Sequence, residues 1–291
     1  MIILTGARGV VGWPLSQRLR AEARPFKAVS RAASNQKGEN LVCWDLHCAM
    51  SPQQAAELTA ATTLIHCAPI WLLSARITDF ITLGVRRVIV FSSTSVQSKQ
   101  TSSDASEQAL VAQLADAEQT VERVCHEAGV KLTIFRPSMI YGYGRDQNVF
   151  KIASVIRRFG FMLLVGNADG LRQPVHADDL VDACLAVLES PSTYGKTYTL
   201  AGAERLSYRA MVERIFNGLG KQVRLYRLPL SLFRVLLWTA SKLTRFNYTP
   251  EMANRMNQDL VYDYQAAVQD FTYQPQTFLA QPQRDLPEEA A

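Results

Sequence analysis

The sequence of 291 residues has no long hydrophobic run and no block of like charges. No apolar stretch reaches the roughly 18 residues that a membrane span needs. The nearest approach, residues 230–237, is interrupted by Ser231 and Arg234. The first apolar run begins at Ile2, which leaves no room for a signal peptide. We therefore expect a soluble, cytoplasmic protein.

Cysteine and histidine are also scarce. The five cysteines form neither a CxxC pair nor an even disulfide framework, so reduced thiols are the simplest interpretation. The four histidines lack the spacing to one another and to the cysteines that a metal site requires, and we predict no metal. These residues are Cys43, Cys48, Cys67, Cys125, Cys184, His47, His66, His126 and His176.

The charge balance excludes one class of partner and favours another. Thirty-one Lys and Arg against 26 Asp and Glu give a net charge of +5. The basic residues are scattered, which argues against nucleic acid as a partner and favours anionic small molecules. With 48% hydrophobic residues the chain can form a packed core, in one large domain or in two that share a cleft.

Short apolar runs alternate with helical signals in the first half of the chain. Pro14 lies near the start of one expected helix, Ser51 and Pro52 begin another, and Gly84 ends the amphipathic stretch 72–83. This alternation predicts βαβ units around a parallel sheet, hence an α/β fold. The expected strands are Ile2–Leu4, Phe26–Val29, Leu41–Trp44, Thr63–Ile65, Val88–Phe91 and Leu132–Phe135.

The second half has a different pattern, with longer helical segments. We expect helices at 147–160, 178–190, 207–219 and 230–245, and strands near 197–200 and 223–226. This pattern predicts a smaller, mostly helical second lobe. The tail from Arg284 to Ala291 is polar, and we expect it to be frayed.

A glycine-rich loop follows the first expected strand. Gly6 permits the turn off the strand, Gly9 lets the backbone approach a pyrophosphate, and Gly12 lets the next helix pack closely on the sheet. The alternative is a plain turn before a helix, but the strand before it and the helix after it favour dinucleotide binding. The predicted cofactor residues of this loop are Gly6, Arg8, Gly9, Val10, Val11 and Gly12.

The end of the second expected strand indicates which dinucleotide is bound. An acidic residue there would bind a ribose 2′-hydroxyl, but the chain has Arg31, and Arg8 lies in the glycine loop. Two guanidiniums suit a 2′-phosphate, so NADP(H) is favoured over NAD(H), unless Arg31 is merely solvated. Asp45 and Leu46 are placed to meet the adenine, although Asp45 is equally suited to cap a turn. Three residues after the fourth strand complete the predicted cofactor site: Cys67, Ala68 and Pro69.

The glycine loop together with later motifs resembles the extended short-chain dehydrogenase/reductase family, the NAD(P)-dependent epimerase/dehydratase group. The resemblance covers most of the chain. It implies a doubly wound parallel Rossmann sheet for the cofactor in residues 1–146, with segments returning to it after 160, and a substrate lobe for a nucleotide sugar mainly in 147–291. The motifs are Thr5-Gly6-x-x-Gly9-x-x-Gly12, Asp45-Leu46, Phe91-Ser92-Ser93-Thr94-Ser95-Val96, Arg136-Pro137-x-x-Ile140-Tyr141-Gly142 and Arg172-Gln173-Pro174-Val175-His176-Ala177-Asp178-Asp179.

The chain departs from this family at the catalytic pair. The family pattern is Tyr-x-x-x-Lys with a glutamate four residues after the lysine, and that glutamate falls on Glu118. The lysine position is then Leu114 and the tyrosine position Leu110. No Tyr-x-x-x-Lys occurs between Ser92 and Arg136. The group that exchanges a proton with the sugar hydroxyl is therefore missing, and so is the lysine that lowers its pKa.

Three residues are candidates to replace the missing acid–base group. Thr94 occupies the family's Ser/Thr position and has a hydroxyl for a substrate oxygen, Lys99 follows the same strand end, and Tyr141 lies where the sixth strand ends. Each also has a plainer explanation. Thr94 is suited to close a strand, Lys99 to be a solvated lysine, and Tyr141 to pack against the sheet edge.

The second lobe contains candidate substrate residues. Arg172 matches the position from which the family reaches the substrate diphosphate, and Asn148 and Arg255 are weaker candidates. The sequence around His176 suggests an acid–base site, but we favour a structural role. Either Asp178 or Asp179 is expected to cap the following helix.

A looser resemblance narrows the predicted reaction. The run Phe91–Lys99 and the segment Met256–Asp263 are similar to bacterial sugar-nucleotide reductases of surface-polysaccharide synthesis. The leading prediction is thus an NADP(H)-dependent oxidoreductase that reduces a 4-keto sugar nucleotide. A nucleotide-sugar 4-epimerase is the alternative within this class. A non-catalytic NADP(H)-binding sensor or partner protein is the alternative outside it, because of Leu110 and Leu114.

Residues 230–245 form an apolar stretch with three cations. A basic amphipathic helix of this kind is compatible with a peripheral contact to an anionic membrane. Docking on the chain's own domain or on a second subunit, as in a homodimer, is favoured because an apolar helix face is more often buried in protein.

Overall fold

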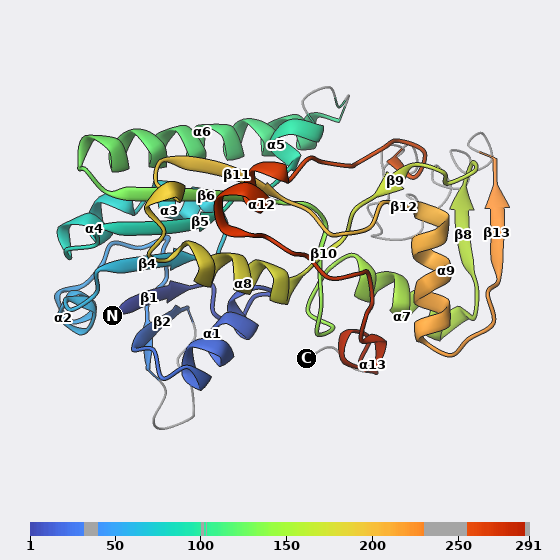
Figure 1. Ribbon diagram of the computed structural model, residues 1–291, viewed down its shortest axis with the longest axis horizontal. Helices are drawn as coiled ribbons and strands as arrows, with labels where there is room; N and C mark the ends of the chain where they lie inside the picture. Colours follow the sequence, from blue (N-terminus) through green and yellow to red (C-terminus); the bar gives the residue numbers. More distant parts are fainter. Residues whose placement is uncertain (32–39, 100–101, 103, 230–254, 289–291) are drawn as a thin grey trace.

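A seven-stranded sheet forms the larger part of the molecule (Figure 1). The computed structural model describes residues 1–31, 40–99, 102, 104–229 and 255–288. All pairings in this sheet are parallel, in the order β11-β6-β5-β4-β1-β2-β3. The predicted α/β class and doubly wound sheet are confirmed. The strands are β1 (Ile2–Thr5), β2 (Phe26–Ser30), β3 (Leu41–Cys43), β4 (Thr63–His66), β5 (Arg87–Phe91), β6 (Lys131–Pro137) and β11 (Lys196–Leu200).

Helices cover both faces of the sheet, which explains why its central strands are nearly continuous apolar runs. Each face has its own core of buried side chains. One face packs against α1 (Gly12–Ala21), α8 (Ala177–Val187) and α12 (Gln265–Phe271). The other packs against α2 (Pro52–Leu58), α3 (Ile70–Ser74), α4 (Ile77–Thr82) and α6 (Ala105–Glu127).

Two local predictions on the second face have different outcomes. Ser51 caps α2 in a capping box, in which its hydroxyl accepts from the Gln54 N–H and the Gln54 side chain accepts from the Ser51 N–H. The predicted cap is confirmed. The single helix expected over 72–83 is wrong, because the chain breaks between α3 and α4. At that break the Arg76 side chain donates to the carbonyl oxygens of Leu46 and His47.

The second lobe has a core of its own, to which α7 (Val149–Phe159) and α9 (Tyr208–Gly218) contribute. The described part of this lobe also contains three two-stranded sheets, of which the sequence predicted one strand, near 223–226. The sheets pair β7 (Ile140–Tyr141) with β10 (Val175–His176), β8 (Met162–Val165) with β13 (Leu225–Leu228), and β9 (Leu171–Arg172) with β12 (Leu206–Ser207). The helix predicted at 230–245 lies outside the described residues. No helix in the described ranges is long and apolar enough to cross a membrane.

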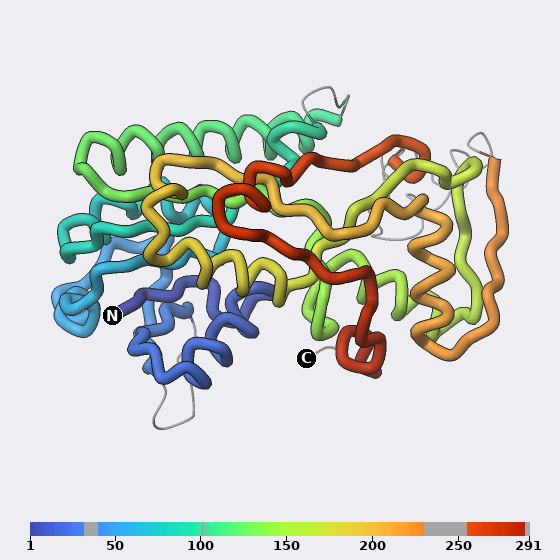
Figure 2. The backbone as a smooth tube through the Cα atoms, viewed as in Figure 1, coloured from blue at the N-terminus to red at the C-terminus, as the bar shows by residue number. Residues whose placement is uncertain are grey.

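The C-terminal segment runs back along the molecule, as the red tube in Figure 2 shows, and ends in α13 (Pro282–Asp285). Asp285 is buried and its carboxylate lies 3.0 Å from the ring of His176. Arg284 joins Asp178 to this group, and Leu286 packs in the core of the second lobe. The prediction of a frayed end is therefore wrong for residues 284–288, since charged residues of this segment find buried partners.

Arg87 is a buried cation at the start of β5. Its guanidinium donates to backbone oxygens of Val88, Lys131, Val187 and Leu188. Burial lowers its pKa to about 10. One side chain thus joins β5 and β6 to the end of α8.

We expect Arg87→Met to lower the free energy of unfolding by about 3 kcal/mol, because several buried carbonyl groups lose their donor. Urea unfolding followed by circular dichroism measures the change. The neighbouring Arg86 is exposed, and within the described part of the chain its side chain bonds only the carbonyls of Ile81 and Val85, so Arg86→Met is the matched control. Equal effects of the two substitutions would contradict this role of Arg87.

Candidate functional site

The glycine loop lies where the order of the sheet reverses, between the carboxyl ends of β1 and β4. Gly6 has φ +71°, and a Cβ there would lie 2.6 Å from the backbone N of Ala68. Gly6 therefore has to be glycine for both conformation and space. The structure brings the loop against Cys67 and Ala68, at the switch point where α/β proteins bind ligands.

Gly9 and Gly12 have different surroundings. A Cβ on Gly12 would overlap the Gly6 carbonyl, whereas a Cβ on Gly9 would meet only the Gly6 oxygen at 3.2 Å and the Cys67 oxygen at 4.0 Å. Arg8 and Gly9 are exposed, and α1 begins at Gly12 without a side-chain cap. The Trp13 and Leu15 N–H groups donate to the Gly9 and Val11 carbonyls, and Pro14 has no N–H. The Gly12 N–H is therefore the donor of this first turn that has no acceptor among the described residues, which fits a bound pyrophosphate.

His66, which the sequence analysis did not select, fixes the neighbouring loop. Its ring is fully buried, and burial lowers its pKa to about 4, so it is neutral at pH 7. Nδ1 lies 2.7 Å from the Thr5 hydroxyl and Nε2 lies 3.1 Å from the Pro69 carbonyl. A carbonyl only accepts, so Nε2 carries the proton and Thr5 donates to Nδ1. The sequence signal that could have identified His66 is a histidine at the end of a buried strand.

The residues predicted to meet the ribose and adenine lie at the ends of β2 and β3. Arg31 is exposed, and its side chain has no ion-pair partner among the described residues. The Asp45 carboxylate accepts from the His47 N–H at 3.0 Å, which is the turn-capping alternative. Leu46 is buried, as is Val11 in the loop, while Val10 is half-buried.

A cavity of about 360 Å³ adjoins the glycine loop at the start of α7. Arg145 donates to the Arg8 carbonyl at 3.3 Å, and its guanidinium lies 4.6 Å from the Trp13 ring centroid. Asp146 accepts from the N–H groups of Asn148 and Phe150, so it caps the entry to α7. The lining includes three cations, Arg8, Arg145 and Lys151, and therefore suits an anion.

The three catalytic candidates lie in different environments. Thr94 is buried and donates to the Pro137 carbonyl at 3.1 Å, so its hydroxyl closes the link between β5 and β6. Tyr141 is fully buried in the second lobe. Its hydroxyl accepts from the Leu279 N–H at 3.0 Å, and burial raises its pKa. This placement argues against Tyr141 as a proton donor to a substrate.

Lys99 belongs to a cluster of charges at the edge of the sheet. It follows the short helix α5 (Ser95–Ser98), and its Nζ lies 3.2 Å from Oε1 of Glu107 in the first turn of α6. Arg255 forms a second ion pair with the same carboxylate. Burial and the nearby Arg255 charge lower the pKa of Lys99. Of the predicted residues, the structure thus brings together Lys99 and Arg255.

Glu107 links these two cations, and the sequence analysis missed it. On α6 it lies on the face of Leu110, Leu114 and Glu118, since residues three or four apart share a face. Leu114 is buried, Leu110 packs partly buried against the same core, and Glu118 forms a two-pronged ion pair with Arg136. The signal that could have identified Glu107 is an acid one turn before Leu110.

Arg172 is buried and is engaged by backbone. Its guanidinium donates to the carbonyls of Leu171, Gln258 and Arg255, and it lies over the Tyr208 ring. This geometry makes Arg172 a support for residues 255–258. Asn148 is exposed directly before α7. Among the described residues, no contact joins it to the charge cluster.

His176 ends β10 and has a fully hydrogen-bonded ring, so the expectation of a satisfied strand residue with a structural role is confirmed. The expected acid cap differs, because His176 itself is the N-cap of α8. Its ring accepts from the Asp178 N–H, while the Asp179 carboxylate accepts from the His176 N–H and completes a capping box. The ring also contacts Asp285.

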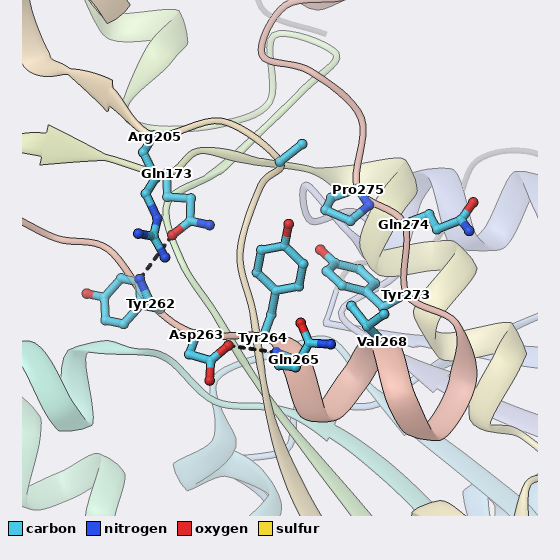
Figure 3. A pocket seen from close by; sticks show the side chains of 11 residues that line it. Gln173, Arg205, Tyr262, Asp263, Tyr264, Gln265, Val268, Tyr273, Gln274 and Pro275 are labelled. Carbon is cyan, nitrogen blue, oxygen red and sulfur yellow. Dashed lines mark hydrogen bonds between the residues drawn. The ribbon is translucent and has the colours of Figure 1, made fainter.

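A larger cavity of about 690 Å³ lies elsewhere, between the start of β12 and the segment 262–275 (Figure 3). The Tyr262 N–H donates to Gln173 Oε1 at 3.0 Å on one side, and the Tyr264 and Tyr273 rings meet on the other. None of the predicted cofactor or catalytic residues lines this cavity.

Comparisons with solved structures show the fold over almost the whole chain. MoeE5 in complex with UDP-glucuronic acid and NAD is 17% identical with a TM-score of 0.74, covering 98% of this chain and 97% of its own. UDP-glucuronic acid 4-epimerase from Bacillus cereus is 14% identical with a TM-score of 0.73, covering 98% and 97%. DesIV, a dTDP-glucose 4,6-dehydratase from Streptomyces venezuelae, is 17% identical with a TM-score of 0.72, covering 98% and 95%.

Curated relatives are similar over a shorter stretch. The mitochondrial NADH dehydrogenase [ubiquinone] 1 alpha subcomplex subunit 9 of Dictyostelium discoideum is 28% identical over 48% of this chain and 39% of its own length. The subunit of the same name in Arabidopsis thaliana is 28% identical over 42% and 29%. The matched region thus spans about two fifths or less of these relatives.

The family model of the NAD dependent epimerase/dehydratase family matches residues 46–201, which is more than half of the chain. This region contains β4 with its buried His66, the α6 helix with Glu118, and the His176 cap of α8. The chain belongs to the NAD dependent epimerase/dehydratase family.

Proposed function

We propose that this protein is an NADP(H)-dependent oxidoreductase that reduces a 4-keto sugar nucleotide for surface-polysaccharide synthesis in the cytoplasm. The observation that carries the proposal is the Lys99–Glu107 pair, which places a half-buried ammonium group at the carboxyl edge of the sheet that also carries the glycine loop. The structural neighbours named above include complexes with nucleotide sugars and NAD, which supports the substrate class.

The bound cofactor would supply a hydride to the substrate carbonyl carbon. The glycine loop and the uncapped start of α1 would hold its pyrophosphate. Arg31 at the end of β2 supports a 2′-phosphate, since no acidic residue of the described part pairs with it. Arg8 lies in the same loop and adds positive charge.

Lys99 would donate the proton that the reduction requires. The Lys99 ammonium group would give its proton to the carbonyl oxygen when the carbonyl carbon is reduced, and solvent would restore that proton afterwards. Burial lowers the pKa of Lys99, which makes its ammonium a stronger acid than a solvated lysine. Glu107 holds the ammonium in place, and Arg255 shares the same carboxylate.

A non-catalytic cofactor-binding protein is the second candidate. Leu110 and Leu114 contribute to the core in place of the family's catalytic pair, and two relatives are named as subunits of an NADH dehydrogenase. A 4-epimerase is a third reading, in which the hydride returns to the substrate and no external NADPH is consumed. Turnover measurements separate the three.

The first experiment incubates the protein with NADPH and a 4-keto-6-deoxy UDP-sugar, with absorbance at 340 nm and mass spectrometry as readouts. A reductase consumes one NADPH for each product, and the product is two mass units heavier. Unchanged NADPH with an isomeric product indicates epimerisation. Tight NADPH binding without turnover on several nucleotide sugars supports the non-catalytic candidate.

Lys99→Met is expected to lower kcat by about 100-fold or more while NADPH affinity stays unchanged, because only the proton donor is removed. Lys131→Met, which removes an exposed cation at the start of β6, is the matched control for loss of charge and should retain kcat. A Lys99→Met enzyme with full kcat would contradict the assignment.

The pH dependence of kcat gives an independent test. The active form of Lys99 is the protonated one, so kcat is constant at low pH and falls as pH rises through its pKa. Because burial and Arg255 lower that pKa, the fall occurs below the ordinary lysine value of 10.5. In Glu107→Gln the ammonium loses its anionic partner, and the fall should move to still lower pH. An unmoved profile would show that another group donates the proton.

Arg31→Glu tests the coenzyme preference. We expect NADPH affinity to fall about tenfold or more, because a carboxylate repels the 2′-phosphate, while NADH affinity is unchanged or higher. Fluorescence titration with both coenzymes measures the ratio, and Arg123→Glu on the exposed face of α6 is the control for net charge. Equal losses for both coenzymes would argue against a 2′-phosphate contact.

Gly9 and Gly12 should respond differently to alanine. Gly12→Ala forces a Cβ into the Gly6 carbonyl and is expected to lower the free energy of unfolding by more than about 2 kcal/mol. Gly9→Ala should cost about 1 kcal/mol or less but weaken NADPH binding roughly tenfold, since its Cβ occupies the space of a pyrophosphate. Normal NADPH affinity in Gly9→Ala would exclude binding at this loop.

A further inference from the structure

The end of the second lobe farthest from the Rossmann sheet is formed by β8 and β13 (Figure 1). In this parallel pair Tyr226 lies beside Leu163, and both side chains are exposed. The neighbouring pair differs, because Leu164 is buried in the core of the second lobe. Leu163 and Tyr226 therefore share the outward face of the ribbon, since side chains alternate along a strand.

This outward face is unusual in its apolar exposure. Phe159 and Tyr226 are each 56% exposed, and Leu163 and Val223 are each 43% exposed. They are the large hydrophobic side chains exposed in the described part of the chain, and Phe159, Leu163 and Tyr226 lie together, whereas Val223 precedes β13 in the same segment. The Phe161 ring connects the set, 6.2 Å from Phe159 and 5.6 Å from Tyr226. A contiguous exposed apolar patch marks an interaction surface.

The segments that build this region are rich in positive charge. The two sequence segments that build it, 147–168 and 214–229, contain no Asp or Glu, although the whole chain has 26. Arg214 pairs with Glu204, away from the patch. The other cations in these segments form no ion pair among the described residues. The cations are Lys151, Arg157, Arg158, Arg214, Lys221, Arg224 and Arg227.

Two of these cations lie near the aromatic side chains. The Arg158 guanidinium is 5.3 Å from the Phe159 ring centroid, and Arg224 is exposed two residues before Tyr226. Arg227 is exposed as well, but it lies beside Leu164 and so on the other side of the ribbon. The Lys221 ammonium donates to the Arg157 carbonyl at 3.0 Å, at the end of α7. The sequence continues in the same manner, since residues 230–250 include three cations and no acid.

We propose that this surface, made of Phe159, Leu163, Tyr226 and the nearby Arg158 and Arg224, binds the surface of an anionic lipid bilayer. Aromatic side chains favour the depth of the headgroups, and arginines bind lipid phosphates. A patch of apolar and cationic groups without a carboxylate is complementary to such a surface. A protein partner of mixed charge would leave the cations unpaired.

The test uses the full-length protein with sedimented vesicles. Vesicles of phosphatidylcholine with 30% phosphatidylglycerol are expected to bind it at 50 mM NaCl, and binding should weaken at least tenfold at 500 mM NaCl. Vesicles of phosphatidylcholine alone should bind at least tenfold more weakly. Failure to bind the anionic vesicles at low salt overturns the proposal.

Variants locate the contact. The charge variant Arg158→Glu, Arg224→Glu and the apolar variant Phe159→Ser, Tyr226→Ser should each reduce binding to anionic vesicles at least tenfold. A charge-matched control, Arg86→Glu, Arg123→Glu, changes exposed arginines of the Rossmann lobe by the same amount and should retain binding.

Each other outcome contradicts the assignment. Equal losses of vesicle binding in the charge variant and in the control mean that net charge alone attracts the vesicles. Unchanged binding in both the charge variant and the apolar variant places the contact elsewhere. If light scattering shows a dimer that Phe159→Ser, Tyr226→Ser dissociates, and no vesicles bind, the occupant is a second copy of the chain. Melting temperatures close to that of the unchanged protein establish that the variants are folded.

Discussion

The arrangement of the Rossmann lobe depends on the close approach of the Gly6 backbone to the chain that leaves β4. No side chain fits between Gly6 and Ala68, so the loops after β1 and β4 diverge from one point at the switch in strand order. His66 reinforces this contact, because its neutral ring joins Thr5 of β1 to the Pro69 carbonyl. The open start of α1 and the exposed Arg8 both follow from this packing.

The α6 helix is joined to β6 by a partly buried ion pair between Glu118 and Arg136. In our interpretation of the sequence, Leu110 and Leu114 stand at the positions of the family's catalytic pair. Both side chains contribute to the apolar core. The polar group nearest to them on the same face is Glu107, which gathers Lys99 and Arg255. An acid–base role has therefore moved toward the start of the helix in our proposal, and Lys99 comes from the preceding loop.

The sheet, the glycine loop and the helix caps could be predicted because each depends on local signals. Buried strands are apolar on both faces, Ser51 has Gln54 three residues later, and Gly6 follows a strand directly. The errors arose where a distant partner decides the structure. The helix breaks at Arg76 because the Arg76 side chain bonds carbonyl groups of the 46–47 turn. Asp285 is buried because it contacts His176, which lies 109 residues earlier in the chain. Tyr141 occupied the expected strand end, yet its hydroxyl is bonded by a backbone group at Leu279, which no local pattern indicates.

Buried arginines that have no carboxylate partner among the described residues hold the irregular parts of the second half. Arg87 binds the carbonyls at the end of α8, and Arg172 does the same for residues 255 and 258. Carbonyl groups outside regular ladders need donors when they are buried, and one guanidinium supplies up to five. Arg172 bears directly on the charge cluster, because it fixes the backbone from which the Arg255 side chain reaches Glu107. Arg172 contacts neither Glu107 nor Lys99, but the separation between these two residues depends on it in this way. The arginine that the resemblance places at the family's diphosphate position thus also supports the candidate active site.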